Sequence, residues 1–152
     1  MKRTAFVTLV LFLTAIIYSS CKEDVYIDWK LQNERWYNIH KNDSGFVTTS
    51  SGLCYKVIHQ GSQRHPNLQD RVHVKYKGTL IDGSVFDESS SSVLYLSQLV
   101  KGWQEGLPLM QDGGHYIFYI PSKLGYDTAT TRSGIPPYSV LRFDVKLIES
   151  NY

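Results

Sequence analysis

Apolar and polar residues alternate in two segments of this 152-residue chain, and this alternation limits the possible folds more than any other feature. In residues 71–77, Val72, Val74 and Tyr76 alternate with basic side chains and a histidine. Residues 141–147 repeat the pattern, while residues 116–120 are continuously apolar. Successive side chains of a strand point to opposite faces, so a period of two predicts strands with one buried face. A continuously apolar run is typical of a central strand.

A short helix and a hairpin are expected beside these strands. Ser97 can cap the helix and Gly106 helps to end it. The Asp82-Gly83 pair predicts the turn of a hairpin, and the serine run at residues 89–92 is expected to lie in a loop. Several strands around one helix predict an α+β domain. The residues expected on the apolar face of the helix are Leu99, Val100, Trp103 and Leu107.

Residues 1–20 are expected to be a signal peptide outside the fold. Lys2 and Arg3 precede an apolar run over residues 5–17, and small residues then lead to Cys21. This three-part layout is typical of a bacterial export signal. The run is shorter than the roughly 20 residues that a spanning helix needs. A buried N-terminal strand or helix is the alternative.

The residues before Cys21 resemble the lipobox of bacterial lipoproteins, although Tyr18 stands where leucine is usual. The resemblance implies that Cys21 becomes the N-terminus and carries lipid chains that tether the protein to a membrane. Residues 22–24 are similar to acidic tags that direct lipoproteins to the outer membrane, but a charged linker looks the same. The expected location is therefore the bacterial cell envelope, with a lipid anchor. Cys54 would then be the single remaining thiol, and it is expected in a strand.

Residues 21–52 are expected to be an N-terminal tether with a short helix. Asp28 can cap this helix, which would run from residue 29 to about residue 40. Residues 48–52 are interpreted as a linker, so the domain proper would cover residues 53–152. The helix is too short for a long dimerising arm, and its apolar face comprises Trp29, Trp36 and Tyr37.

Composition and motifs exclude several classes of function. The formal net charge of +2 is too small to suggest a nucleic-acid partner, and two cysteines cannot make a disulfide scaffold. Phosphate-binding loops, dinucleotide fingerprints and zinc-protease motifs do not occur. The five histidines lack the spacing of metal ligands, so no metal, nucleotide or redox cofactor is expected. The aromatic fraction of 13% predicts a ring-rich core or binding pocket.

Five segments in a fixed order carry a resemblance to a known family. They are residues 72–87, 101–107, 119–126, 135–137 and 143–145. In this order and spacing they look like an FKBP-type peptidyl-prolyl cis-trans isomerase, and the resemblance extends over about residues 51–150. It implies a twisted antiparallel sheet, a half barrel, wrapped around one short α-helix. A hydrophobic pocket between sheet and helix would hold a proline ring.

The resemblance also implies which residues form the pocket. Trp103 would be its floor, and Asp87 would act electrostatically. The Tyr126 hydroxyl would donate to the substrate carbonyl, and the Ile135 backbone N–H would orient the peptide. Taken without the resemblance, each ring is more simply a core aromatic, and Asp87 is equally compatible with a turn cap. The full set is Tyr76, Phe86, Asp87, Leu99, Val100, Trp103, Tyr126, Ile135 and Phe143.

The activity implied is rotation about Xaa-Pro bonds of proline-containing clients during protein folding in the envelope, with macrolides as candidate inhibitors. The alternative is a binding module or holdase on the same fold. The intact set of Tyr76, Phe86, Asp87, Trp103 and Tyr126 argues against this alternative, whereas the rim loop favours it. Two departures from the family bear on substrate preference and turnover. Glycines are usual after Tyr126, whereas Asp127 follows here, which predicts a stiffer and more polar rim loop over residues 127–134. Val93, with Tyr95 close by, replaces the aromatic residue usual in the pocket wall.

Overall fold

The structure is a computed structural model that describes residues 26–129 and 134–151. The predicted signal peptide, Cys21 and residues 130–133 of the rim loop lie outside the described residues. Within these two described ranges, no helix is both long and apolar enough to cross a membrane.

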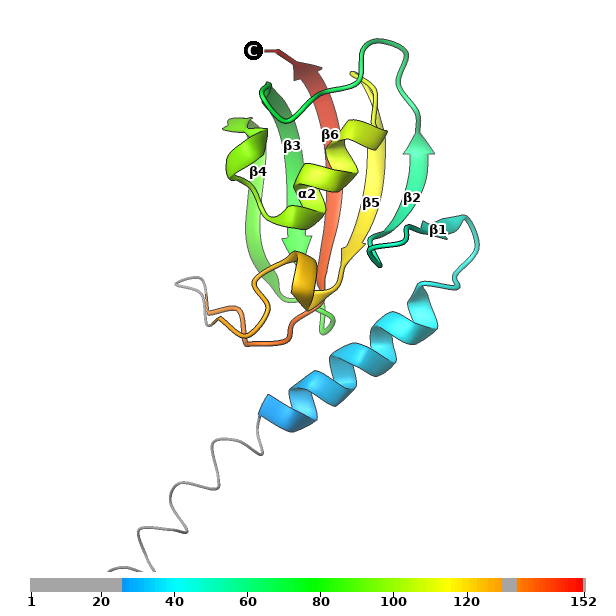
Figure 1. The fold of residues 1–152 in the computed structure, drawn as a ribbon, viewed down its shortest axis with the longest axis vertical. Helices are drawn as coiled ribbons and strands as arrows, with labels where there is room; N and C mark the ends of the chain where they lie inside the picture. Colours follow the sequence, from blue (N-terminus) through cyan, green and yellow to red (C-terminus); the bar gives the residue numbers. More distant parts are fainter. Residues whose placement is uncertain (1–25, 130–133, 152) are drawn as a thin grey trace, which may run out of the picture.

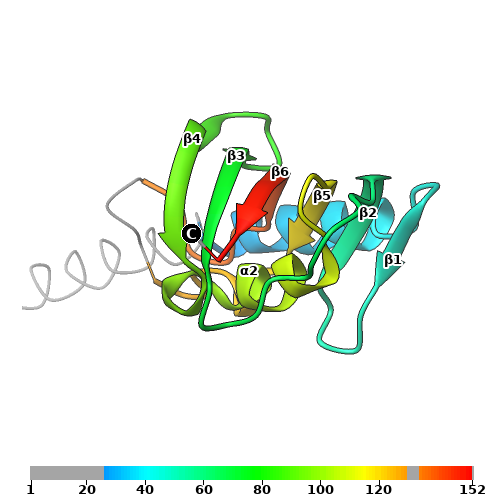
Figure 2. The same ribbon diagram turned by 90° about the horizontal axis from the view of Figure 1, so that it is seen from above.

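A single antiparallel sheet of six strands forms the body of the protein, in the order β1-β2-β5-β6-β3-β4. Helix α2 (Lys101–Gly106) lies across one face of this sheet (Figures 1 and 2). A second helix covers residues 26–40 and is called the N-terminal helix below. The strands are β1 (Phe46–Thr48), β2 (Cys54–His59), β3 (Arg71–Thr79), β4 (Val85–Tyr95), β5 (His115–Ile120) and β6 (Leu141–Ser150). The 3-10 turns are η1 (Leu96–Gln98), η2 (Leu107–Leu109) and η3 (Ser122–Leu124). The predicted α+β class, a twisted sheet around a short helix, is confirmed.

The strands predicted from alternation form the middle of the sheet. β3 and β6 are neighbours, and their alternate apolar residues are buried on the side of α2. β5 lies between β2 and β6, as its continuous apolar run predicted. Its Phe118 joins the core, whereas Tyr119 packs beneath Trp36 of the N-terminal helix, with ring centroids 4.9 Å apart. Both faces of β5 are therefore covered, which explains why its sequence does not alternate.

Two expectations around the pocket helix are wrong. Residues 89–92 were expected in a loop, but they belong to the edge strand β4, which pairs with β3 around a bulge. Backbone ladder bonds hold an edge strand whatever its side chains, so the serine run does not interrupt it. Ser97 does not cap α2, because the helix begins at Lys101 with Val100 as N-cap and no side-chain cap bond. The helix does end at Gly106, where a Cβ atom would lie 2.7 Å from the Phe118 ring.

The N-terminal helix and β1 are integrated into the fold. The helix ends at His40, as predicted, but residues 26–28 are already helical, so Asp28 is not its N-cap. An aspartate is also favoured inside a first helical turn, so its presence alone does not locate the cap. Residues 48–52 end β1 and form the hairpin loop to β2 rather than a linker. Gly52 allows this loop, because its φ of +91° suits glycine. The division at residue 53 stays a prediction, and many contacts cross it.

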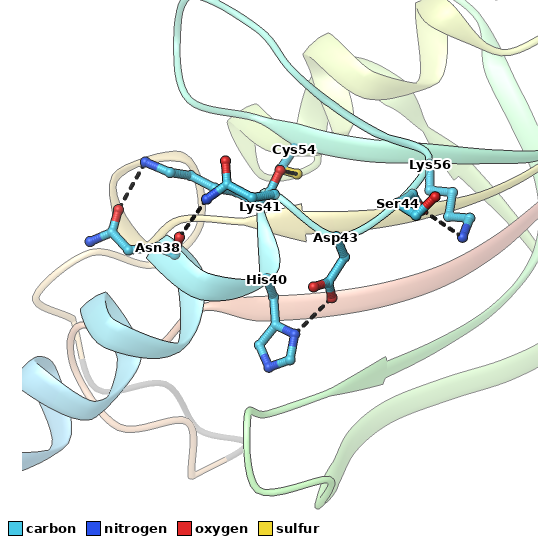
Figure 3. A network of polar contacts seen from close by, with 8 residues as sticks. Asn38, His40, Lys41, Asp43, Ser44, Cys54 and Lys56 are labelled. Carbon is cyan, nitrogen blue, oxygen red and sulfur yellow. Dashed lines mark hydrogen bonds and ion pairs between the residues drawn. The ribbon is translucent and has the colours of Figure 1, made fainter.

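The turn after the N-terminal helix is tied to β2 by polar contacts (Figure 3). His40 Nδ1 lies 2.8 Å from Asp43 Oδ2, and Lys56 Nζ donates to the Ser44 carbonyl at 2.9 Å. Cys54 is a buried strand residue with a free thiol, as predicted for its position. These contacts place the C-terminal end of the helix beside β1 and β2.

Candidate functional site

A ring-lined pocket of ≈ 180 Å³ opens between α2 and the concave face of the sheet. Its walls come from β3, β4 and β6, the turn before α2, and Tyr126 from the β5–β6 connection. The structure thus brings together seven of the nine residues predicted for the site. The lining residues are Tyr76, Asp87, Leu94, Gln98, Leu99, Val100, Trp103, Tyr126 and Phe143.

Aromatic side chains enclose the floor of this pocket. The Trp103 ring is 4% exposed and lies perpendicular to Tyr76 at 5.3 Å and to Phe143 at 5.1 Å between centroids. Phe86 supports Phe143 from behind in the same edge-to-face manner, at 5.3 Å. Gly78 makes this packing possible, because a Cβ atom there would lie 2.6 Å from Phe86 and 2.8 Å from Phe143. The cage is therefore rigid as well as apolar.

The turn that enters α2 positions the helical side of the pocket. The side-chain amide of Gln104 donates to the Leu99 carbonyl at 2.7 Å and to the Ser97 carbonyl at 3.1 Å. These bonds fix the backbone that carries Leu99 and Val100. Trp103 Nε1 is buried and has no hydrogen-bond partner among the described residues. An unpaired buried donor destabilises a fold by about 1–3 kcal/mol, and such groups are often found at functional sites.

An acid and two phenols form the polar rim. The Tyr76 hydroxyl donates to Asp87 Oδ2 at 2.9 Å. Burial, followed by the bond to Asp87 and its charge, raises the pKa of Tyr76 to about 12. Burial and the Asp87 charge also raise the pKa of Tyr126. Both phenols therefore stay protonated donors at neutral pH beside one carboxylate. In the part of the chain that the structure describes, no ion pair involves Asp87.

The backbone that carries Tyr126 has an unusual conformation. Asp127 has a φ of +51° and Tyr138 a φ of +64°, both in the left-handed region. The Tyr138 N–H donates to the Asp127 carbonyl at 2.7 Å, which joins the two residues directly. Asp127 occupies the place of the family's usual glycine, and it adopts a conformation that glycine takes without steric penalty. The stiffness predicted for the rim loop stays a prediction, because residues 130–133 of this loop lie outside the described residues.

Some predicted site residues lie elsewhere, and two lining residues were not predicted. Ile135 is 1% exposed and its side chain belongs to the core, while Phe86 lies behind the wall. Leu94, not Val93, lines the pocket, and Tyr95 is exposed under the Arg71 guanidinium. The bulge between β3 and β4 sets which of the successive residues 93–95 turns inward, and sequence spacing does not show a bulge. Gln98 belongs to none of the sequence segments that resemble the family, so the sequence did not indicate that it lines the pocket.

A larger hollow of ≈ 450 Å³ lies on the opposite face of the sheet, but its chemistry differs. Lysines and acids line it, including Lys75, Lys146 and Glu88, and Tyr76 is its single aromatic residue. The described residues contain no group of three or more histidine, cysteine or acidic side chains that could hold a metal ion. The ring-lined pocket is thus the candidate site.

Comparisons with known proteins agree with this geometry. The family model described as FKBP-type peptidyl-prolyl cis-trans isomerase matches residues 62–148. A probable FKBP-type peptidyl-prolyl cis-trans isomerase FkpA from Neisseria meningitidis is 41% identical over 124 residues, which are 79% of this chain and 46% of that protein. The outer membrane protein MIP of Legionella longbeachae is 35% identical over 123 residues, covering 78% of this chain and 53% of that protein. The chain thus spans about half the length of these curated relatives.

Solved structures show the same fold. The crystal structure of FkpA from Escherichia coli superposes with a TM-score of 0.83 at 35% identity, covering 95% of this chain and 70% of that one. A peptidyl-prolyl cis-trans isomerase from Pseudomonas syringae gives a TM-score of 0.77 at 28% identity, covering 82% of this chain and 96% of that one. With more than half of its length matched by the family model, the chain belongs to the FKBP-type peptidyl-prolyl cis-trans isomerase family.

Proposed function

We propose that this protein is a peptidyl-prolyl cis-trans isomerase that accelerates rotation about Xaa-Pro bonds in polypeptides. The observation that supports this most strongly is the apolar cage of Trp103, Tyr76 and Phe143, with Asp87 bonded to Tyr76 at its rim. A cage of this kind fits a small ring such as that of proline. The acid at the rim lies where the peptide carbonyl next to that ring would enter.

The chemistry requires no bond cleavage. Rotation faces a barrier of about 20 kcal/mol because the twisted amide loses its resonance. The planar form is more dipolar than the twisted form, so a dry apolar pocket favours the twisted form relative to the planar one. Each 1.4 kcal/mol or so of such differential stabilisation raises the rate about tenfold.

The pocket residues divide this work. Trp103, Val100 and Phe143 grip the proline ring, and the Tyr126 hydroxyl donates to the substrate carbonyl. Asp87, oriented by Tyr76, acts on the carbonyl dipole through its charge and transfers no proton. The role of the Ile135 backbone N–H in orienting the peptide stays a prediction. Macrolide inhibitors are predicted to compete for the same pocket.

The direct test is magnetisation-exchange NMR on an Xaa-Pro peptide with the purified protein. We expect accelerated exchange that falls about tenfold or more in Asp87→Ala, equivalent to losing about 1.4 kcal/mol of transition-state stabilisation. Glu88→Ala is the matched control, since the neighbouring acid lines the hollow on the opposite face. Equal activity in folded Asp87→Ala protein would show that the site is misassigned.

A second function, peptide holding without catalysis, is supported by the rim. Asp127 and Tyr138 in left-handed conformations make this edge of the pocket unlike a glycine-rich loop. A folded protein that broadens the peptide resonances but leaves the exchange rate unchanged would establish this binding module instead.

We further propose that the protein works in the bacterial cell envelope, tethered by lipid on Cys21. The layout of residues 1–21 supports this, and the Legionella relative is itself named an outer membrane protein. Its clients would be proline-containing polypeptides that fold there, because uncatalysed proline isomerisation is slow. Mass spectrometry of the protein from its native membrane should find an N-terminal acylated Cys21, which Cys21→Ala removes. An unmodified N-terminus that retains Met1 would contradict the proposal.

A further inference from the structure

The N-terminal helix holds three consecutive residues of the β5–β6 connection. Val140 N–H donates to Asn33 Oδ1 at 2.8 Å, and Trp29 Nε1 donates to Ser139 Oγ at 2.9 Å. Lys30 Nζ lies 5.1 Å from the centre of the Tyr138 ring, a cation–π contact. Figure 1 shows this helix alongside the orange segment that connects β5 to β6. We call Trp29, Lys30 and Asn33 the helix clamp.

Asn33 is the central member of the clamp. Its side chain is fully buried, although asparagine is usually exposed. Its amide nitrogen donates to the Trp29 carbonyl at 2.8 Å, which leaves its oxygen to accept the Val140 N–H. Val140 is itself 4% exposed, so its N–H would have no water to bond in place of Asn33.

The clamped residues lie between two parts of the candidate site. Tyr138 N–H is bonded to the carbonyl of Asp127, the residue directly after Tyr126. Val140 directly precedes β6, which carries Phe143 in the pocket wall. A shift of the clamped segment would therefore move the Tyr126 side of the pocket and the start of the Phe143 strand.

The backbone conformation of the clamped segment shows why it needs contacts that hold it. Asp127 and Tyr138 are both non-glycine residues with positive φ. Such residues persist only where surrounding contacts over-determine them, and they gather at functional sites. Tyr126 is 40% exposed, so burial alone does not hold its ring in place. The contacts from the helix to residues 138–140 supply the missing restraint.

We propose that the helix clamp positions Tyr126 and the rim of the pocket, with Asn33 as the main positioning residue. The N-terminal helix is then part of the working site and more than a tether. This inference rests on the proposed isomerase function for its kinetic test, and peptide binding tests it separately.

The test compares Asn33→Ala with Tyr37→Phe in the full chain. The Tyr37 hydroxyl donates to the Gly52 carbonyl, so this control removes a bond of the same helix that does not involve residues 138–140. We expect Asn33→Ala to raise KM and the peptide Kd, and to lower kcat/KM about tenfold, since misplacement by about 1 Å can reduce a rate 10²-fold. Amide hydrogen exchange at Val140 should quicken in Asn33→Ala alone. Tyr37→Phe should leave kcat/KM and Kd unchanged.

Trp29→Phe keeps an aromatic side chain but replaces the indole with a smaller ring that cannot donate to Ser139. This variant is used if Asn33→Ala does not fold. A smaller rise in KM and Kd is expected there. Unchanged Kd and KM in folded Asn33→Ala or Trp29→Phe protein would overturn the clamp, as would an equal loss in Tyr37→Phe. An inactive wild-type protein would contradict the proposed function alone, because the Kd and exchange readouts would still report on the clamp.

Discussion

Tyr76 keeps its phenolic proton to high pH, because burial and Asp87 raise its pKa to about 12. Between pH 10 and 12 the unfolded chain therefore loses this proton while the folded chain keeps it. Stability that is fully present below pH 10 is lost as the pH rises through 12. We expect urea denaturation to show a steeper loss across this range for wild type than for Tyr76→Phe. The other buried tyrosines affect both proteins alike, so parallel curves would mean that folding does not raise the pKa of Tyr76.

Gly78 is a second test at the level of single residues. Gly78→Ala places a Cβ atom against the Phe86 and Phe143 rings, so we expect a loss of about 1–3 kcal/mol in unfolding free energy and weaker peptide binding. Gly83→Ala is the control, because nothing lies within 4 Å of its Cβ position and only its φ of +85° opposes alanine. That control should lose stability without affecting peptide binding. Unchanged peptide affinity in Gly78→Ala would remove Phe143 from the binding surface.

At the level of elements, the turn before α2 depends on Gln104. Gln104→Ala removes two bonds to the carbonyls of Ser97 and Leu99, so we expect a loss of about 1 kcal/mol per bond at most. The loss in peptide-binding free energy should exceed the loss in unfolding free energy, because the backbone that carries Leu99 and Val100 is no longer held in place. Isothermal titration with an Xaa-Pro peptide measures this. Glu105→Ala, whose side chain accepts from Ser51 instead, should keep the affinity of wild type.

Element boundaries show where local signals were sufficient and where they were not. β3 and β6 follow directly from alternation, since a period of two is a property of the strand itself. The expected cap at Ser97 and loop at residues 89–92 were wrong, because tertiary bonds outweighed local preference. Gln104 donates to the Ser97 carbonyl in the turn where Ser97 was expected to cap the helix. β3 pairs with the backbone of the serine run, which therefore stays in a strand.

For the whole molecule, the structure predicts that residues before 53 contribute to stability. A protein that begins at residue 53 lacks the N-terminal helix and β1, which exposes Tyr119, now 7% exposed beneath Trp36 and Phe46. Exposing one large apolar side chain costs about 1.5–3 kcal/mol, and the Val140 N–H also loses Asn33. We expect a lower unfolding midpoint in urea than for a protein that begins at residue 26. Equal midpoints would support residue 53 as the true start of the domain.

The sequence predicted those site residues that belong to the ordered motifs of the family. Trp103, Asp87 and Tyr126 were expected together, and the structure places them around one pocket. Leu94 and Gln98 were missed, and the Ile135 side chain lies in the core, while the role of its backbone N–H stays a prediction. A bulge in β4 and the packing of the β5–β6 connection decide which side chains reach the pocket. Neither feature can be recognised from the spacing of residues in the sequence.

The sequence by itself determined the antiparallel strands, the short helix with Trp103, and an aromatic pocket beside Asp87. These properties repeat over a few residues or follow the order of motifs along the chain. Only the tertiary structure decided that Asn33 bonds Val140, 107 positions away, and that the N-terminal helix restrains the strained pair Asp127 and Tyr138. The physical reason is that such contacts depend on where the chain returns after folding. A buried N–H finds its acceptor through the path of the backbone, which no local pattern of residues encodes.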